Sequence, residues 1–299
     1  METPVMQSLP RLIKRLTSGA RLAGPFFMLG AALLFTLMSV LVKLLPQGYT
    51  VWHIGLIRCM GGLVLLLAFT PRRKNPFAGH NIPLLVFRGL AGTLAFLCAM
   101  AALRTLPIST ACVLFYSYPV FAAVCGLLIY KEAVNIRQVI CMLTLIAGVG
   151  VLFDFSLTGS LFGQAMAIAG ALFAGLTVTL IRSLRERNGV VVIYLYFCAV
   201  GTLFTLPYCI QHPIFPASAT EWIMISLIVL ASATAQLMMN QGFFFCKGFE
   251  GGVYMSTETV FTAMVGIFLL DDPVSWRFFA GALLILGSGL ALNKVSQTG

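Results

Sequence analysis

The chain has 299 residues, of which 60% are hydrophobic and 9% are charged, and its mean hydropathy is +0.98. Soluble domains carry about 25% charged residues, so this composition excludes a water-soluble domain, a disordered chain and a nucleic-acid-binding protein. The formal net charge is +10, but the basic residues lie between apolar runs, which is typical of membrane orientation signals rather than of a phosphate-binding groove.

The N-terminal segment 1–23 comes first and is basic. A cleavable signal peptide is one interpretation of this start. However, the apolar run that follows has full membrane-spanning length, lacks a clear small-x-small cleavage site and has a counterpart later in the chain. We therefore expect residues 1–23 to be a cytoplasmic tail ahead of an uncleaved first membrane helix.

Ten apolar runs follow along the chain, each close to the roughly 20 residues that a helix needs to cross the hydrocarbon core. The expected spans are 24–45, 51–70, 82–103, 107–130, 136–153, 161–181, 190–208, 221–245, 251–270 and 276–293. Short connections with turn-forming residues separate them, and no connection is long enough to hold a soluble domain. The sequence therefore predicts an all-α membrane protein with ten transmembrane helices.

Lysine and arginine residues indicate the orientation, because they concentrate on cytoplasmic loops. If both termini are cytoplasmic, fourteen basic residues fall inside and three fall outside. The inside group is Arg11, Lys14, Arg15, Arg21, Arg72, Arg73, Lys74, Lys131, Arg137, Arg182, Arg185, Arg187, Lys247 and Lys294, and the outside group is Lys43, Arg104 and Arg277. We predict that both termini are cytoplasmic.

The two halves of the chain match each other at an offset of 140 residues. Residues 120–123 (Val-Phe-Ala-Ala) align with residues 260–263 (Val-Phe-Thr-Ala), and further matches continue without a gap. We therefore expect two five-helix repeats, 24–153 and 161–293. Since five is odd, the second repeat enters the membrane from the opposite side, and such inverted repeats are common in secondary transporters with a substrate site near the midplane.

Two short motifs recur at equivalent positions in the two repeats. The first repeat carries Tyr-Pro-Val-Phe at 118–121 and Tyr-Lys-Glu at 130–132, and the second carries Glu-Thr-Val-Phe at 258–261 and Leu-Asp-Asp at 270–272. These motifs resemble the ten-helix EamA-type transporters of the drug/metabolite transporter superfamily over essentially the whole chain after the tail. That family commonly has a Glu-Pro pair in the second copy, and here Thr259 replaces the proline.

The resemblance implies a secondary transporter in a bacterial inner (plasma) membrane. It would move a small organic metabolite, an amino acid or related solute, outward by alternating access at a midplane cavity. Import or exchange of a nucleoside-like metabolite such as S-adenosylmethionine is the alternative within the family. The chain has no G-x-x-x-x-G-K-[ST] motif for ATP, so the driving force is a substrate gradient or proton coupling. The oligomeric state stays open.

Other classes of membrane protein fit the sequence less well. A membrane-embedded enzyme needs clustered His, Asp or Ser side chains, and no such cluster is evident in the sequence. A receptor or structural membrane protein has no need of inverted symmetry. His53, His80 and His212 are scattered and the eight cysteines form no C-x-x-C pair. We therefore expect free thiols, with neither a metal site nor another cofactor.

Glu258 is the first candidate site residue. It is the eighth residue of the run 251–270, so it lies about 12 Å from the cytoplasmic end at 1.5 Å per residue. A charge inside the membrane costs about 2.5–3.5 kcal/mol on insertion scales. The functional interpretation is a cavity carboxylate that binds substrate or takes a proton, and the alternative is a structural carboxylate paired with Arg or Tyr. Tyr118 is its equivalent in the first repeat, and Phe115 shares the helix face of Tyr118.

Further polar residues lie inside predicted spans. Pro119 can kink its helix and free a carbonyl. Arg58 and Arg88 can each hold a substrate carboxylate or phosphate or pair with the buried carboxylate, although Arg88 can also extend to the cytoplasmic face. Gln236 and Asn240 offer neutral donors and acceptors, either to substrate or to a neighbouring helix. The candidate substrate-binding residues are Glu258, Tyr118, Arg58, Arg88, Asn240, Gln236, Phe115 and Pro119.

Overall fold

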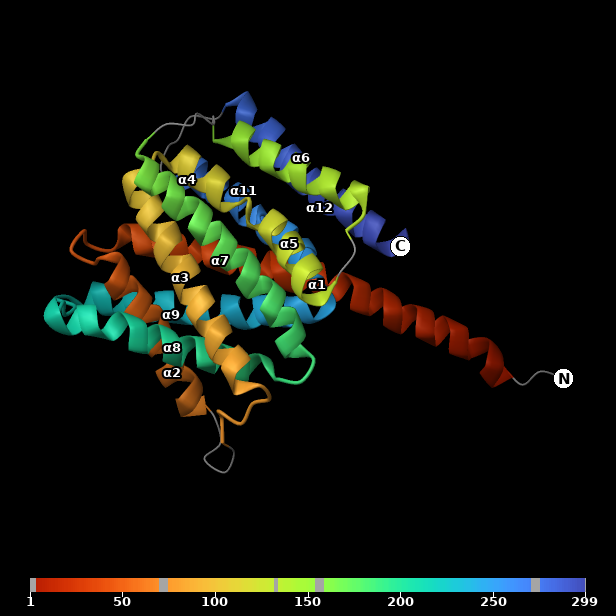
Figure 1. Cartoon of the computed structure of the whole chain (residues 1–299), viewed down its shortest axis with the longest axis horizontal. Helices are drawn as coiled ribbons and strands as arrows, with labels where there is room; N and C mark the ends of the chain where they lie inside the picture. The colour runs from red at the N-terminus through yellow and green to blue at the C-terminus, as the bar shows by residue number, and fades with distance from the viewer. Residues whose placement is uncertain (1–3, 70–74, 132–133, 154–158, 270–274, 299) are drawn as a thin grey trace.

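The computed structural model describes residues 4–69, 75–131, 134–153, 159–269 and 275–298, and every regular element in these ranges is a helix. The helices are α1 (Pro4–Leu44), α2 (Val51–Phe69), α3 (Ile82–Thr105), α4 (Ile108–Phe115), α5 (Tyr118–Tyr130), α6 (Ile136–Leu152), α7 (Leu161–Arg185), α8 (Val190–Gln211), α9 (Ala219–Phe245), α10 (Gly248–Met255), α11 (Thr257–Leu269) and α12 (Trp276–Thr298). The fold is all-α, as the sequence predicts (Figure 1). Glu132 and Asp272, which end two of the motifs, lie outside the described residues.

Ten membrane crossings follow from these helices. Within the described residues, seven helical segments are long and apolar enough to cross a membrane. They are Ala23–Leu44, Val51–Phe69, Ile82–Thr105, Thr110–Tyr130, Leu161–Arg185, Val190–Gln211 and Ala219–Phe245. Two shorter apolar helices, Ile136–Leu152 and Trp276–Leu292, and the pair α10 and α11 supply the other three. The predicted tail 1–23 continues the first helix from Pro4, and this part of α1 projects from the bundle (Figure 1).

Two of the predicted spans are interrupted rather than continuous. The span 107–130 is divided into α4 and α5, and the span 251–270 is divided into α10 and α11. The first pieces, α4 and α10, begin 140 residues apart at Ile108 and Gly248 and have the same length. The interruption is therefore a feature of the repeat itself, and both repeats carry it at the same position.

Hydroxyl groups at equivalent positions mark both interruptions. Ser117 Oγ donates to the Leu114 carbonyl at 2.6 Å, and Thr257 Oγ1 donates to the Tyr254 carbonyl at 2.8 Å. Such local bonds compete with the i→i−4 ladder of an α-helix. Pro119 lies in the first turn of α5, where its missing N–H leaves no helix bond unmade. The kink predicted from Pro119 is confirmed, because the span is interrupted between α4 and α5, directly before the proline, where the missing N–H and the ring break a continuous helix.

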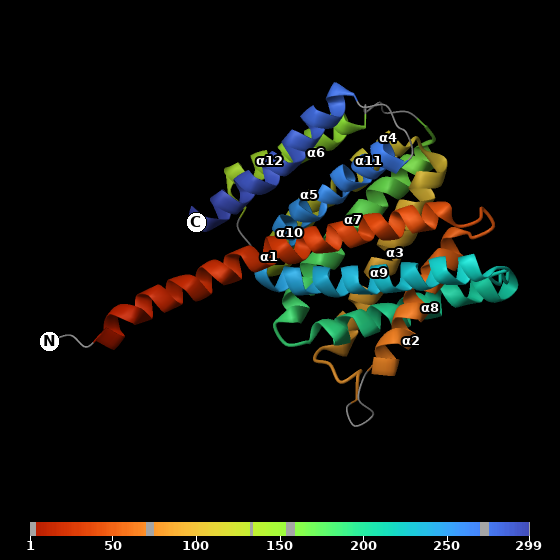
Figure 2. The ribbon, with the colours of Figure 1, turned by 180° about the vertical axis from the view of Figure 1, so that it is seen from behind.

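The helix packing has the symmetry of an inverted repeat. α3 packs on α7 as α9 packs on α1, and α3 packs on α8 as α9 packs on α2. The pairs α2–α8 and α6–α12 each join equivalent helices of the two repeats, and α5 packs on α10 between the two interrupted spans. Figures 1 and 2 show α6 and α12 side by side along one edge of the bundle. The two halves thus surround a common centre, where the interrupted helices meet.

Glycine permits close approach at some of these contacts. A Cβ on Gly175 of α7 would lie 2.7 Å from the backbone nitrogen of Ala122 in α5. A Cβ on Gly281 of α12 would lie 2.8 Å from the carbonyl oxygen of Gly148 in α6. In each case the obstacle is backbone, which cannot rotate away as a side chain can. These glycines therefore hold helices of the two repeats in direct backbone contact.

Candidate functional site

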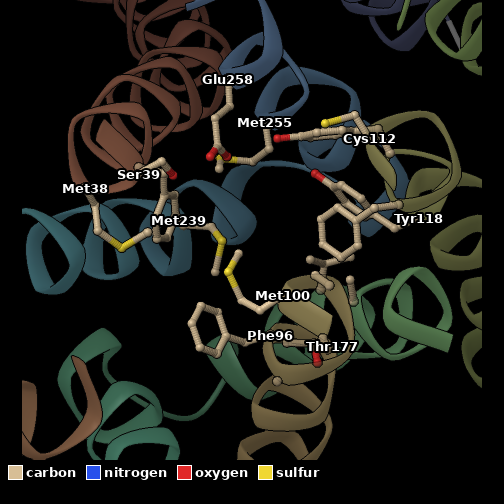
Figure 3. A pocket seen from close by; sticks show the side chains of 18 of the residues that line it. Met38, Ser39, Phe96, Met100, Cys112, Tyr118, Thr177, Met239, Met255 and Glu258 are labelled. Atoms are coloured by element: carbon tan, nitrogen blue, oxygen red, sulfur yellow. The ribbon is translucent and has the colours of Figure 1, made fainter. Parts of the chain in front are cut away.

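A cavity of about 370 Å³ lies where the two interrupted helices meet. Its walls are mostly apolar, and they come from both repeats. The lining residues are Phe35, Met38, Ser39, Arg58, Arg88, Gly92, Ala95, Phe96, Ala99, Met100, Leu103, Ala111, Cys112, Phe115, Tyr116, Tyr118, Phe153, Ala174, Thr177, Val178, Phe197, Gln236, Met239, Met255, Glu258, Thr259 and Thr262. Figure 3 shows how side chains from several helices converge on this space.

The cavity extends from the middle of the bundle toward one end of the helices. Its lining runs along α3 from Arg88 to Leu103, near the C-terminal end of that helix. It also includes Phe153 just after α6 and Ala111 in the first turn of α4. Because successive spans run in opposite directions, the ends of α3 and α6 and the start of α4 lie at the same end of the bundle. The cavity therefore extends from the interruptions toward that end.

Glu258 lies in the first turn of α11, directly after the interruption, and its carboxylate points into the cavity (Figure 3). The unpaired N–H groups and dipole of a helix N-terminus favour negative charge. Tyr116 and Arg58 line the same cavity and are the polar neighbours that act on this carboxylate. The sequence predicted a glutamate inside a continuous helix. The interruption instead places this partly buried carboxylate at a favourable helix start.

Arg88 is fully buried at the edge of the cavity. Its Nη2 donates to Asn240 Oδ1 at 3.2 Å, and its guanidinium carbon lies 5.0 Å from the centroid of the Phe197 ring. The predicted extension of Arg88 to the cytoplasmic face is therefore wrong. Among the residues that the structure describes, its Nε and Nη1 have no hydrogen-bond partner.

Arg58 is the more accessible of the two arginines, with 8% of its surface exposed. Its guanidinium carbon lies 4.6 Å from the centroid of the Phe96 ring and 5.8 Å from that of Phe35. Within the described ranges, no ion pair joins Arg58 or Arg88 to Glu258. The alternative of a direct Arg–Glu pair is thus not what the structure contains.

The remaining candidates divide between the cavity and the packing behind it. Tyr118, Phe115 and Gln236 line the cavity. Tyr118 also donates its hydroxyl to the Gly252 carbonyl of α10 at 2.9 Å, which ties the two interrupted helices together. Pro119 and Asn240 are not part of the lining: Pro119 packs near Gly252, and Asn240 accepts the bond from the buried arginine. Of the two alternatives for Asn240, contact with substrate or with a neighbouring helix, the structure therefore shows the second.

Comparison with known proteins identifies the family to which this chain belongs. Residues 22–153 and residues 161–293 each match the EamA-like transporter family. The chain belongs to the EamA-like transporter family. The predicted resemblance is confirmed, and the protein is an integral membrane transporter.

Named relatives of this EamA-like transporter are also transporters. The pseudopaline exporter CntI of Pseudomonas aeruginosa is 24% identical over 270 residues, which cover 89% of this chain and 94% of that protein. Solute carrier family 35 member G1 of Homo sapiens is 22% identical over 303 residues, which cover 92% of this chain and 80% of that protein. A solved crystal structure superposes with a TM-score of 0.74 at 18% identity, covering 94% of this chain and 98% of the other, and it supports the fold alone.

Several lining residues of the EamA-like chain are not among the site residues predicted from the sequence. Tyr116 was missed because it falls inside an interruption that apolar composition does not reveal, although it is only two residues before Tyr118. Four methionines, Met38, Met100, Met239 and Met255, were missed because they read as ordinary membrane-helix residues. They come from α1, α3, α9 and α10 and surround the space that Glu258 enters (Figure 3). The signal for them lies in tertiary packing rather than in spacing along the chain.

A polar network ties loops and helix ends together at the end of the bundle toward which the cavity extends. The Tyr49 hydroxyl donates to Glu221 Oε2 at 3.0 Å, and Arg104 Nη2 donates to the Tyr49 carbonyl at 3.4 Å. His53 Nε2 lies 2.7 Å from the His212 carbonyl. Burial and the neighbouring Glu221 carboxylate raise the pKa of the Tyr49 phenol above its ordinary value. This network joins the α1–α2 connection to α3 and α9.

Proposed function

We propose that the protein is a secondary transporter that exports an amino acid or related small organic solute by alternating access. The observation that carries this proposal is the cavity itself. Its volume of about 370 Å³ suits a small metabolite, it lies at the interruptions of two equivalent helices, and it contains charged groups from both repeats. Solute sites of inverted-repeat transporters form in this way at interrupted helices. The name of the relative CntI, a pseudopaline exporter, supports the outward direction.

The repeat symmetry supplies the motion. Two equivalent halves that meet at a central site can exchange their packing at the two ends of the bundle, so that the site faces each side in turn. On the predicted orientation, with both termini cytoplasmic, the ends of α3 and α6 face outward. The cavity then extends from mid-bundle toward the outward side, to which an exported solute leaves.

Proton coupling through Glu258 is part of this proposal. A carboxyl group in a largely apolar cavity is costly to leave charged without a partner. Tyr116 and Arg58 line the same cavity as this carboxylate, and a bound proton removes its charge. Solute binding and proton binding at this one side chain would therefore be linked, which couples export to proton entry.

The test uses purified protein in liposomes loaded with a pool of labelled amino acids and nucleoside metabolites. Efflux is followed with and without a pH gradient for the wild type, for Glu258→Gln and for the control Glu186→Gln, which makes the same change at an exposed helix end. We expect the wild type and the control to move a solute faster under a pH gradient. We expect Glu258→Gln to lose that dependence.

Each result separates the roles of the carboxylate. If Glu258→Gln keeps downhill flux and loses only the effect of the gradient, Glu258 is the proton site. If it loses all flux while it remains folded, Glu258 is a substrate ligand or gate, and proton coupling through it is withdrawn. If it behaves as the control does, the carboxylate is structural. If no pooled solute moves through wild-type liposomes, the proposed substrate class is wrong.

A further inference from the structure

Two opposite charges face the same cavity without forming an ion pair. Arg58 comes from α2 of the first repeat and Glu258 from α11 of the second. They are close enough to attract each other electrostatically, yet no ion pair joins them within the described ranges. Space for a ligand therefore remains between a cation and an anion in a mostly apolar setting, where charges interact strongly.

Arg58 is prepared to receive an anion. The rings of Phe96 and Phe35 lie 4.6 Å and 5.8 Å from its guanidinium carbon. Such rings hold the cation, and among the described residues no hydrogen bond uses its N–H donors. A guanidinium has five donors in a fork that matches a carboxylate. Arg88 also borders the cavity, but it has no exposed surface and already donates to Asn240. Arg58 is therefore the first cation that a solute meets.

Glu258 is prepared to receive a cation. Its carboxylate enters the cavity from the start of α11, and Tyr116 reaches one side of it. A carboxylate has about four acceptor positions, so a hydrogen bond from Tyr116 leaves others for an ammonium group. The hydroxyl groups of Thr259 and Thr262 are on neighbouring turns of the lining.

The rest of the cavity favours an apolar substituent of variable shape. Met38, Met100, Met239 and Met255 contribute flexible thioether side chains from four helices. Methionine adapts to irregular shapes and contacts aromatic rings well, which is why it is frequent at permissive binding surfaces. Figure 3 shows these side chains around the space below Glu258.

We propose that the cavity binds an apolar α-amino acid as a zwitterion, with its carboxylate on Arg58, its ammonium on Glu258 and its side chain against the four methionines. The inference rests on the proposed transport function and names its substrate class. A zwitterion satisfies Arg58 and Glu258 at once. A solute that carries only the acid or only the amine leaves one buried charge without a partner, which is strongly unfavourable.

The test measures equilibrium binding of three matched probes to the purified protein in detergent: L-phenylalanine, 3-phenylpropanoate, which lacks the amine, and phenethylamine, which lacks the carboxylate. We expect L-phenylalanine to bind at least about 30-fold more tightly than either analogue, because loss of one partner of a buried charge pair costs at least this factor. The exposed control Glu186→Gln should keep this order.

Each variant should change which of the three probes binds most tightly, rather than weaken the binding of all three. Glu258→Gln removes the anion, so we expect it to bind 3-phenylpropanoate as well as L-phenylalanine or better. Arg58→Gln removes the cation, so we expect it to bind phenethylamine as well as L-phenylalanine or better. A merely structural role would lower all three affinities together, and that result would overturn the inference. If Arg58→Gln does not fold, the Glu258→Gln comparison decides alone.

The inference and the transport function can fail separately. Equal binding of all three probes to the wild type, or no binding of any probe, overturns the zwitterion assignment. Flux of another solute by the same preparation would then leave the transport function standing. Absence of all flux together with tight L-phenylalanine binding would contradict transport and not the site.

Discussion

The hydrogen bond between Arg88 and Asn240 gives a sharp test of how polar groups stabilise this membrane bundle. Arg88 lies on α3 and Asn240 on α9, so the 3.2 Å bond from Nη2 to Oδ1 joins the two repeats. Both side chains are fully buried. The perturbation is Asn240→Leu, which keeps a similar volume and removes the acceptor.

The expected magnitude follows from the lack of substitutes. Interhelical hydrogen bonds in membrane proteins average roughly 0.6 kcal/mol because a broken bond often finds another partner. Bonds to charged groups contribute about 1.5–3 kcal/mol. Two of the three Arg88 nitrogens already have no hydrogen-bond partner among the described residues, so a replacement acceptor is lacking. We therefore expect Asn240→Leu to lower the free energy of unfolding by about 1.5–3 kcal/mol, which is roughly 10- to 150-fold in the equilibrium constant.

The assay is unfolding by titration with sodium dodecyl sulfate in mixed micelles, followed by circular dichroism. Ser226→Ala is the matched control, because Ser226 is exposed on the same helix and donates only within that helix, to the Trp222 carbonyl at 2.8 Å. Removing the charge as well, in Arg88→Met/Asn240→Leu, should recover much of the loss, since apolar replacement of a buried ion is often neutral or stabilising.

Two results would refute this reasoning. The first is an Asn240→Leu protein whose free energy of unfolding differs from the wild type by no more than the Ser226→Ala control. The second is an Arg88→Met/Asn240→Leu protein whose loss of unfolding free energy equals the sum of the losses in the two single variants. Additive losses would mean that the two side chains do not interact.

Two further predictions concern packing and pH. Gly175→Ala should lower the Tm by about 2–6 °C, because the new Cβ would lie 2.7 Å from the Ala122 backbone nitrogen. The control Gly287→Ala, with no described atom within 4 Å of the new Cβ, should leave the Tm unchanged or raise it. Equal Tm shifts of the two variants on heating in detergent would contradict the close contact at Gly175. The pKa of Tyr49 is raised by burial and by Glu221, so the folded protein holds this proton more tightly than the unfolded chain does. The resulting stabilisation is complete below about pH 10 and is lost as the pH rises through the folded pKa. Tyr49→Phe should remove this loss of stability above about pH 10, and parallel curves of stability against pH for the two proteins would contradict the prediction.

Much of the fold could be predicted from the sequence, and the candidate site only in part. The ten crossings follow from the lengths of the apolar runs. The 140-residue offset between the repeats reappears in the structure, where α4 begins at Ile108 and α10 begins at Gly248. The interruption before α5 was predicted as a kink at Pro119. The interruption before α11 was not predicted, because a threonine that bonds a nearby carbonyl looks the same in sequence as one that faces solvent. Of the eight candidate site residues, Asn240 and Pro119 lie behind the cavity rather than in its lining.

The sequence by itself determined how many times the chain crosses the membrane and that its halves are related, because lipid acts on each segment separately through its length and its apolar composition. Tertiary structure decided which polar groups meet. Arg88 donates a hydrogen bond to Asn240, which lies 152 positions later in the chain, and Glu258 lies near Tyr116 of the other repeat. A buried charge needs partners within a few ångströms, and the packing of two repeats against each other determines which residues come that close.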